Sequence, residues 1–271
     1  MSKLKMWNEY DSWEKAEAAW DEGARVAASK QSIKRLNQLP DMPGMTPETA
    51  KHLKWKSLKW MIVKDKERKI LKGFLRHPLR YGWAFLRSVW QKKSYVRDGD
   101  FFLYGLKDMD EFAKLIHDKE SLLVVGFSYC HKPFECPSGR FTDACIHAPD
   151  HPVCRQCFIG KCVNALPETQ VIPLFIPTVH YIGGKIFEIV HGVSPRRVLF
   201  MITACEMTLE MFGDWGNMVG IKGIGIRLDG RICNTMKAFE LSEQGIKPGL
   251  TVILESTQRR LLDLIRQRRK T

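Results

Sequence analysis

The sequence lacks any run of eighteen or more apolar residues, and its first thirty residues contain no apolar stretch of the secretory kind. The missing runs exclude an obvious membrane-spanning helix, because such a helix needs about 20 consecutive, mostly apolar residues. The missing signal leads us to expect a cytoplasmic protein, in which thiols stay reduced. No Ser/His/Asp order, phosphate loop or carboxylate pair stands out either, so the sequence leaves open whether the protein is an enzyme.

Cysteine is absent from the first 129 residues, although the chain has eight cysteines in all. An unbiased scatter of eight residues over 271 positions would rarely leave that half empty. The cysteines therefore point to one region with a shared role. They are Cys130, Cys136, Cys145, Cys154, Cys157, Cys162, Cys205 and Cys233.

Acidic residues are scarce between Lys51 and Arg97, where 15 Lys and Arg face only Asp65 and Glu67. This segment sums to +13, which equals the formal net charge of the whole chain, so the remainder balances to zero. A segment of this kind attracts anionic surfaces, either phospholipid or nucleic acid.

The chain divides near residue 100 into a helical, basic N-terminal extension (residues 1–100) and a cysteine-rich α/β domain (residues 101–271). In the extension, residues 11–30 are rich in Ala and Glu and predict a helix. Residues 36–47 hold three prolines and predict a linker. Thr46, followed by proline and glutamate, predicts a helix start, and Pro78 predicts another helix that runs to about Lys92.

After residue 100, short apolar runs alternate with helical stretches. Strands that are apolar on both faces and separated by helices predict a mostly parallel, open sheet with helices on both faces. The expected strands are residues 122–127, 171–176, 198–203, 220–227 and 250–255. The expected helices are residues 108–117, 185–191, 206–212 and 257–269.

Three cysteines follow expected strands: Cys130, Cys205 and Cys233. Because the carboxyl ends of parallel strands share one edge of a sheet, we expect these thiols to converge there. Crowded thiolates repel one another, and a shared cation makes such clustering favourable at neutral pH.

The other cysteines lie in one loop, where Cys154 and Cys157 form a C-x2-C pair and Cys162 follows. Zinc and iron–sulfur sites both use this spacing. We therefore expect all eight cysteines to serve as ligands of one or two iron–sulfur clusters, of the 4Fe-4S type, acting in electron transfer or redox chemistry. The alternatives are a zinc-stabilised, non-catalytic binding module, buried free thiols, and disulfides. His131, His147 and His151 are candidates to complete a mixed zinc site, or are simply polar loop residues.

Four stretches resemble the cysteine-rich proteins of archaea and anaerobic bacteria grouped as domain of unknown function 116. They are YCHKPFECPSG (129–139), VCRQCFIGKC (153–162), TACEMTLE (203–210) and IRLDGRICNT (226–235). The resemblance covers about residues 100–250 and supports seven of the cysteines, but not clearly Cys145. The sequence departs from the family in the four residues before Cys162 and in the Arg231-Ile232 insertion. The family implies no activity, but it implies contact with membranes.

The segment from Leu79 to Lys93 carries apolar residues at helical spacing: Leu79, Trp83, Leu86 and Trp90, flanked by Phe85 and Val89. Trp and basic residues on one amphipathic helix suit a bilayer interface. The alternatives are packing on the α/β domain or a partner subunit, and nucleic-acid binding. The partner of residues 51–97 is accordingly expected to be a protein or an anionic membrane, with nucleic acid less favoured. If that partner is the membrane, the protein would be a membrane-peripheral accessory subunit on its inner face, which is a third alternative for its function.

Three shorter motifs have local interpretations. The run Ile182-Gly183-Gly184-Lys185 predicts a turn before a helix, where backbone amides could approach an anion; a plain tight turn is the preferred interpretation. Glu206 is interpreted as a solvated acid at a helix start, with tuning of a centre or proton transfer as the alternative. Thr235 is expected to cap the next helix, the alternative being that Asn234-Thr235 donates to a cluster sulfur.

Overall fold

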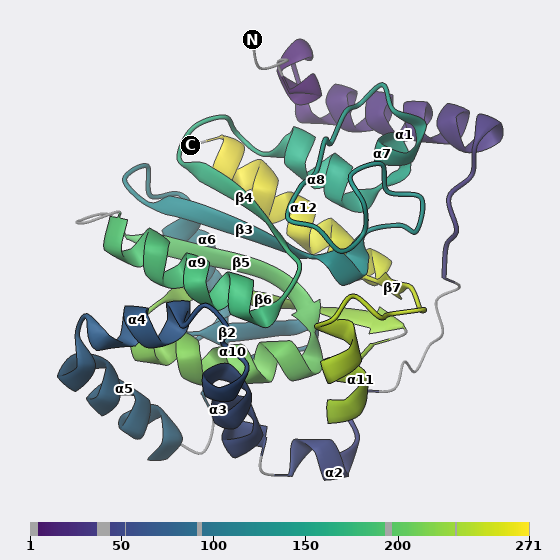
Figure 1. Cartoon of the computed structure of the whole chain (residues 1–271). Coiled ribbons are helices and arrows are strands. Elements are labelled where there is room, and N and C mark those ends of the chain that lie inside the picture. The colour runs from purple at the N-terminus through teal and green to yellow at the C-terminus, as the bar shows by residue number, and fades with distance from the viewer. Residues whose placement is uncertain are drawn as a thin grey trace.

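The structure is a computed structural model that describes residues 5–36, 44–51, 53–90, 94–192, 197–230 and 232–270. Its described strands form one open seven-stranded sheet in the order β1-β2-β6-β5-β3-β4, with β7 paired to β6 (Figure 1). The long strands β3, β4, β5 and β6 are mutually parallel, and the shorter ones join antiparallel. The strands are β1 (Val96–Asp98), β2 (Phe101–Tyr104), β3 (Leu122–Ser128), β4 (Val171–Ile176), β5 (Val198–Cys205), β6 (Lys222–Gly230) and β7 (Thr251–Val252).

The expected fold class is confirmed, since helices cover both faces of this sheet. One face packs against η1 (Met6–Glu9), α1 (Trp13–Lys30), α6 (Met109–Ile116), α8 (Phe158–Ala165) and α12 (Glu255–Arg269). The other packs against α3 (Leu53–Val63), α4 (Lys69–Leu75), α5 (Pro78–Trp90), α9 (Val179–Gly192), α10 (Glu206–Val219) and α11 (Met236–Ser242). In β3, alternate residues serve the two cores: Leu123 and Val125 the first, Leu122 and Val124 the second. This is why the strand is apolar throughout.

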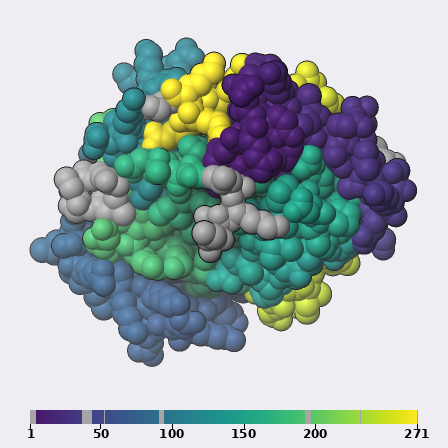
Figure 2. All heavy atoms as spheres, turned by 90° about the horizontal axis from the view of Figure 1, so that it is seen from above, coloured from purple at the N-terminus to yellow at the C-terminus, as the bar shows by residue number. Residues whose placement is uncertain are grey.

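The N-terminal extension is helical as expected, and its parts pack on both sides of the sheet. In Figure 2, α1 (purple) lies over the teal segment that follows β3, and α1 contacts α7 (Pro152–Gln156). The helices α3, α4 and α5 form an outer layer against α9 and α10 (Figure 1). Both expected helix starts are confirmed, because Thr46 caps α2 (Pro47–Ala50) and α5 begins at Pro78. The division into two domains at residue 100 stays a prediction, and most of the expected linker lies outside the described residues.

Several boundaries differ from the expected ones for local reasons. Strand β6 begins at Lys222, because Gly220 has a positive φ of 71° and ends α10. Strand β7 has only two residues, and α12 already begins at Glu255. The strands β1 and β2 were not expected, because they are only three and four residues long and follow the basic segment directly.

The expected turn at Gly183 and Gly184 is wrong, because α9 begins at Val179 and both glycines lie inside it. A helix start for an anion therefore does not exist at that position. A Cβ on Gly183 would come within 2.9 Å of Ile70 on α4, so the missing side chain lets the two helices approach closely.

The strand order places a ligand-binding edge next to the cysteines. From β3 the chain crosses to β4 on one side and then returns to β5 on the other side. The order of parallel strands therefore reverses between β3 and β5. Open α/β sheets bind ligands at the carboxyl ends of the strands beside such a reversal.

Candidate thiol and metal site

Three thiols meet at the point where the strand order reverses. Cys130 lies in η2 (Tyr129–His131) directly after β3, and Cys205 is the last residue of β5 and the N-cap of α10. Cys233 lies in the segment after β6. All three are at most 6% exposed and line one cavity of about 30 Å³, roughly the space of one or two water molecules. The expected convergence of these three thiols is confirmed.

The surroundings of these three thiols shift their pKa values in different directions. A hydrogen bond from the Cys233 thiol, together with the Lys247 ammonium, lowers the pKa of Cys205 despite its burial. The same hydrogen bond raises the pKa of Cys233, and burial raises the pKa of Cys130. Lys247 Nζ donates to Cys233 Sγ at 3.5 Å, and Thr208 Oγ1 lies 3.2 Å from Cys205 Sγ. The group therefore favours one thiolate, on Cys205, beside two neutral thiols.

Four other thiols form a second group in the long segment after η2. Cys136 and Cys145 each raise the pKa of Cys154 and Cys157 through their charge, in addition to the larger effect of burial. Cys136 acts in the same way on Cys145. Burial and these interactions together raise the pKa of Cys154 to about 11 and that of Cys157 to about 12. The C-x2-C pair is thus gathered with Cys145 and Cys136, which precede Cys154 by 9 and 18 residues.

A buried lysine that the sequence did not single out, Lys132, lies near three members of the four-thiol group. Lys132 is 1% exposed, and its ammonium donates to the carbonyl oxygens of Gly139, Thr142 and Ala144 at 2.7–3.3 Å. Burial lowers the pKa of Lys132, while the charges of three of the four thiols oppose that shift. The cation therefore holds the loop backbone in place and supplies positive charge next to the thiols.

Arg140 ties this loop to the C-terminal part of the domain. Its guanidinium donates to the carbonyl oxygens of Cys130 and Lys132, and also to those of Lys247 and Gly249. Arg140 therefore connects the segment that directly follows β3 to residues 247–249, which include Lys247 beside the three-thiol group.

The remaining candidates have local roles. Cys162 is fully buried in the core of α8, where burial strongly raises its pKa. His151 caps α7, and His147 Nδ1 bonds the carbonyl oxygen of Cys145. His131 differs, because its buried Nδ1 has no partner in the described part of the chain and burial lowers its pKa to about 4.

Glu206 is not the solvated acid that the sequence suggested. It is 8% exposed, its carboxylate pairs with Arg97 Nη1 at 2.7 Å, and it accepts a hydrogen bond from the Met45 amide. Thr235, in contrast, caps α11 as expected. Glu206 thus links β1 and the segment before α2 to the start of α10.

The described residues contain no group of three or more His, Cys, Asp or Glu side chains that is arranged to hold a metal ion. The seven grouped thiols are therefore neighbours rather than a preformed ligand shell. The four-thiol group has the number and kind of ligands that a zinc or iron–sulfur centre uses, but its sulfurs do not surround one point.

No protein-family model, curated protein or solved structure matches this chain. The resemblance to domain of unknown function 116 consequently stays a prediction. No helix among the described residues is both long enough and apolar enough to span a bilayer.

Proposed function

We propose that this is a metal-centre protein whose iron–sulfur cluster is held by Cys136, Cys145, Cys154 and Cys157 and which acts in electron transfer or redox chemistry. The observation that carries the proposal is the gathering of these four thiols, from three separate points of one loop, within electrostatic reach of one another. Four thiolates are the usual ligand set of such clusters.

The energetics of the loop support a bound cation. Burial raises the pKa values of Cys145, Cys154 and Cys157. The Lys132 ammonium is a nearby cation for Cys136, Cys145 and Cys157. A metal would deprotonate them and replace their mutual repulsion with shared attraction. Binding would require the side chains to reorganise around the metal. Cys136 and Cys145 lie outside helices and strands, where the chain moves more readily, whereas Cys154 and Cys157 are fixed by α7 and α8. The centre would supply electrons, while Lys132 would offset part of the negative charge of its ligands.

The three-thiol group supports a redox role at the same edge of the sheet. Its cavity of about 30 Å³ has little room for a second multi-atom cluster as it stands. The hydrogen bond from Cys233 and the charge of Lys247 lower the pKa of Cys205, which favours the thiolate, the form of cysteine that reacts as a nucleophile. We infer that the chemistry occurs at this group and that the resident centre lies in the loop.

The proposal is tested by purifying the full chain without oxygen and measuring iron, sulfide and zinc per chain, together with electron paramagnetic resonance after dithionite reduction. We expect a brown protein with about four iron and four sulfide per chain and a signal typical of a reduced cluster. A colourless protein without bound metal would overturn it.

A zinc-stabilised, non-catalytic binding module is the second candidate, and His131 favours it. Its imidazole is buried and neutral, with an unpartnered Nδ1, and neutral imidazole is the form that binds zinc. About one zinc per chain in a colourless protein, reduced by His131→Phe, would favour this candidate over an iron–sulfur cluster.

A further inference from the structure

Helix α5 turns its apolar stripe away from the protein. The helix packs on α10 through its other face, where Tyr81 and Ser88 are buried and Ser88 Oγ donates to Asp214 Oδ1 at 3.1 Å. The interpretation that the stripe packs on the α/β domain is therefore wrong. The stripe residues are Leu79 (89% exposed), Trp83 (64%), Leu86 (47%) and Trp90 (72%).

The neighbouring helices α3 and α4 carry further exposed apolar side chains. Nine of the 17 large hydrophobic side chains that are exposed in the described residues belong to α3, α4 and α5, so the exposure is concentrated there. Apolar exposure on this scale marks an interaction surface. Besides the stripe, the members are Trp55, Ile62, Val63, Leu71 and Leu75.

Exposed cations are interspersed with these apolar side chains. Asp65 and Glu67 are the only acidic residues between positions 51 and 97 of the sequence. Glu67 already pairs with Lys69 at 2.6 Å. Long basic side chains can lay their stems on an apolar surface while their charges reach outward. The exposed cations of the described helices and their connections are Lys59, Lys64, Lys66, Arg68, Lys69, Lys72, Arg76, Arg80 and Arg87.

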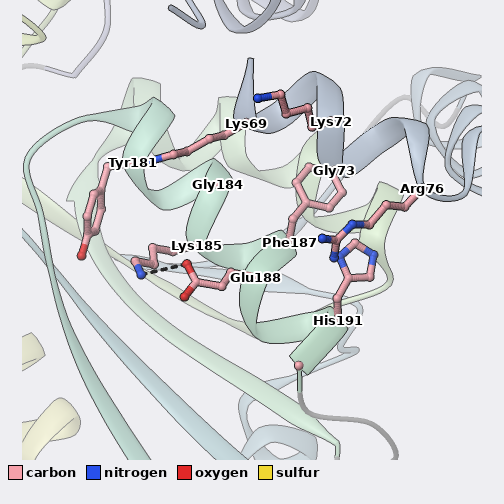
Figure 3. Close-up of a pocket in the computed structure, with 11 residues that line it drawn as sticks. Lys69, Lys72, Gly73, Arg76, Tyr181, Gly184, Lys185, Phe187, Glu188 and His191 are labelled. Atoms are coloured by element: carbon pink, nitrogen blue, oxygen red, sulfur yellow. Dashed lines mark hydrogen bonds and ion pairs between the residues drawn. The ribbon is translucent and has the colours of Figure 1, made fainter. Parts of the chain in front are cut away.

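A cavity of about 460 Å³ opens between α4 and α9 beside this surface (Figure 3). Four cations line it, namely Lys69, Lys72, Arg76 and Lys185, against the single carboxylate of Glu188. The Glu188 carboxylate already forms an ion pair with Lys185 at 2.8 Å. Among the described residues, no acid forms an ion pair with Lys72 or Arg76. The ion pair with Glu67 raises the pKa of Lys69, while the positive charge of Lys185 acts in the opposite direction. An anionic group in the cavity would relieve this repulsion.

We propose that α3, α4 and α5 dock on an anionic phospholipid bilayer, with Leu79, Trp83 and Trp90 inserted at its interface and a headgroup phosphate bound in the cavity between α4 and α9. Trp and Leu on one side of a basic amphipathic helix are what an interfacial helix needs. The complementary charge comes from the surrounding cations, each worth roughly a fivefold gain in binding near an anionic surface. This inference is independent of the metal centre.

The aliphatic part of the surface favours lipid over nucleic acid. Single-stranded nucleic acid gains from cations and aromatic stacking, but it gains little from contact with exposed leucine or isoleucine. Leu75 and Leu79 are 59% and 89% exposed. Insertion into the hydrocarbon of a bilayer would remove both side chains from water.

The test is flotation of the full chain with vesicles made of equal parts phosphatidylglycerol and phosphatidylcholine, compared with vesicles of phosphatidylcholine alone. Wild type should float with the anionic vesicles only. Lys72→Gln with Arg76→Gln should weaken binding about 30-fold, because two cations are lost. Leu79→Glu with Trp83→Glu should abolish flotation, and both pairs change exposed side chains, so the circular dichroism of the folded protein should not alter.

Matched control pairs lie on other faces of the molecule. Lys114→Gln with Arg259→Gln removes two exposed cations from α6 and α12, and Val26→Glu with Ile246→Glu changes two exposed apolar residues. Both control pairs should float like wild type. Equal loss of binding in test and control variants would overturn the proposal, as would unchanged binding in the test variants.

Three further outcomes would also overturn it. They are equal binding to vesicles of phosphatidylcholine alone, competition by inorganic phosphate at millimolar concentration and constant ionic strength, and preferential binding to a single-stranded oligonucleotide over the anionic vesicles. The second would assign the cavity to free phosphate, and the third would assign the surface to nucleic acid.

Discussion

Lys132 holds the backbone of the cysteine loop together through hydrogen bonds from its ammonium. Its ammonium is the common donor to three loop carbonyls and interacts with three of the four thiols, those of Cys136, Cys145 and Cys157. A lysine in the run HKPF carries no sequence signal that separates a buried cation from a surface one. Burial depends on the path of the whole loop, and that path is set by long-range hydrogen bonds such as those from Arg140 to Lys247 and Gly249.

Replacing Lys132 with methionine tests this role. The substitution keeps the length of the side chain but leaves buried carbonyl oxygens without a donor, so we expect a loss of about 3 kcal/mol in the free energy of unfolding. Urea unfolding measures it. Lys114→Met, at an exposed position of α6, should change stability by less than about 0.5 kcal/mol. Equal effects of the two substitutions would contradict the role given to Lys132.

Glu243 makes stability depend on pH. Burial raises its pKa to about 8 from an ordinary value of 4.5, although the Val179 amide donates to it at 2.9 Å. The folded protein therefore holds a proton that the unfolded chain has already lost, so stability falls as pH rises from about 4.5 to about 8. Glu243→Gln removes this fall, and its stability should exceed that of wild type at pH 8.

Urea midpoints at pH 5 and pH 8 measure the effect of Glu243. The exposed substitution Glu120→Gln serves as the control and should keep the pH profile of wild type. If Glu243→Gln declines between the two pH values as steeply as wild type does, another group causes the dependence.

At the scale of elements, the short helices α7 and α8 set the position of the C-x2-C pair. A Cβ on Gly160 would lie 2.3 Å from the carbonyl oxygen of Cys154, so only glycine lets the two helices meet this closely. Backbone, unlike a flexible side chain, cannot move aside without displacing Cys154 itself. The close approach therefore depends on one residue.

Gly160→Ala should accordingly destabilise the protein by about 1–3 kcal/mol and lower its metal content. Gly192→Ala, at the end of α9 where a Cβ meets no atom within 4 Å, should leave both unchanged. Urea unfolding and elemental analysis of the two variants provide the comparison. Normal metal content in Gly160→Ala would show that metal binding does not depend on the close contact between α7 and α8.

Sequence reasoning found the elements whose pattern is local. The apolar runs of β3, β4 and β5, the caps Thr46 and Thr235, and the three cysteines at strand ends could all be predicted, because each depends on neighbours in the chain or on the rule for parallel strands. The start of α9 was misplaced, because two glycines look like a turn unless the packing of α4 on them is known.

At the scale of the molecule, the division of the cysteines could not be predicted. Spacing alone links Cys162 to the C-x2-C pair, yet Cys162 is fully buried in α8 and Cys145, nine residues before Cys154, takes part in the four-thiol group. The fold divides the eight into three thiols at the sheet edge, four in the loop and one in the core. Whether these groups bind metal stays a prediction.

The most direct measurement of the central claim compares iron content in Cys145→Ser and Cys162→Ala, both purified without oxygen. If the four-thiol group holds the cluster, Cys145→Ser should lose most of its iron and its reduced-state paramagnetic signal, while Cys162→Ala keeps both. Full iron in Cys145→Ser together with loss of iron in Cys162→Ala would contradict the account.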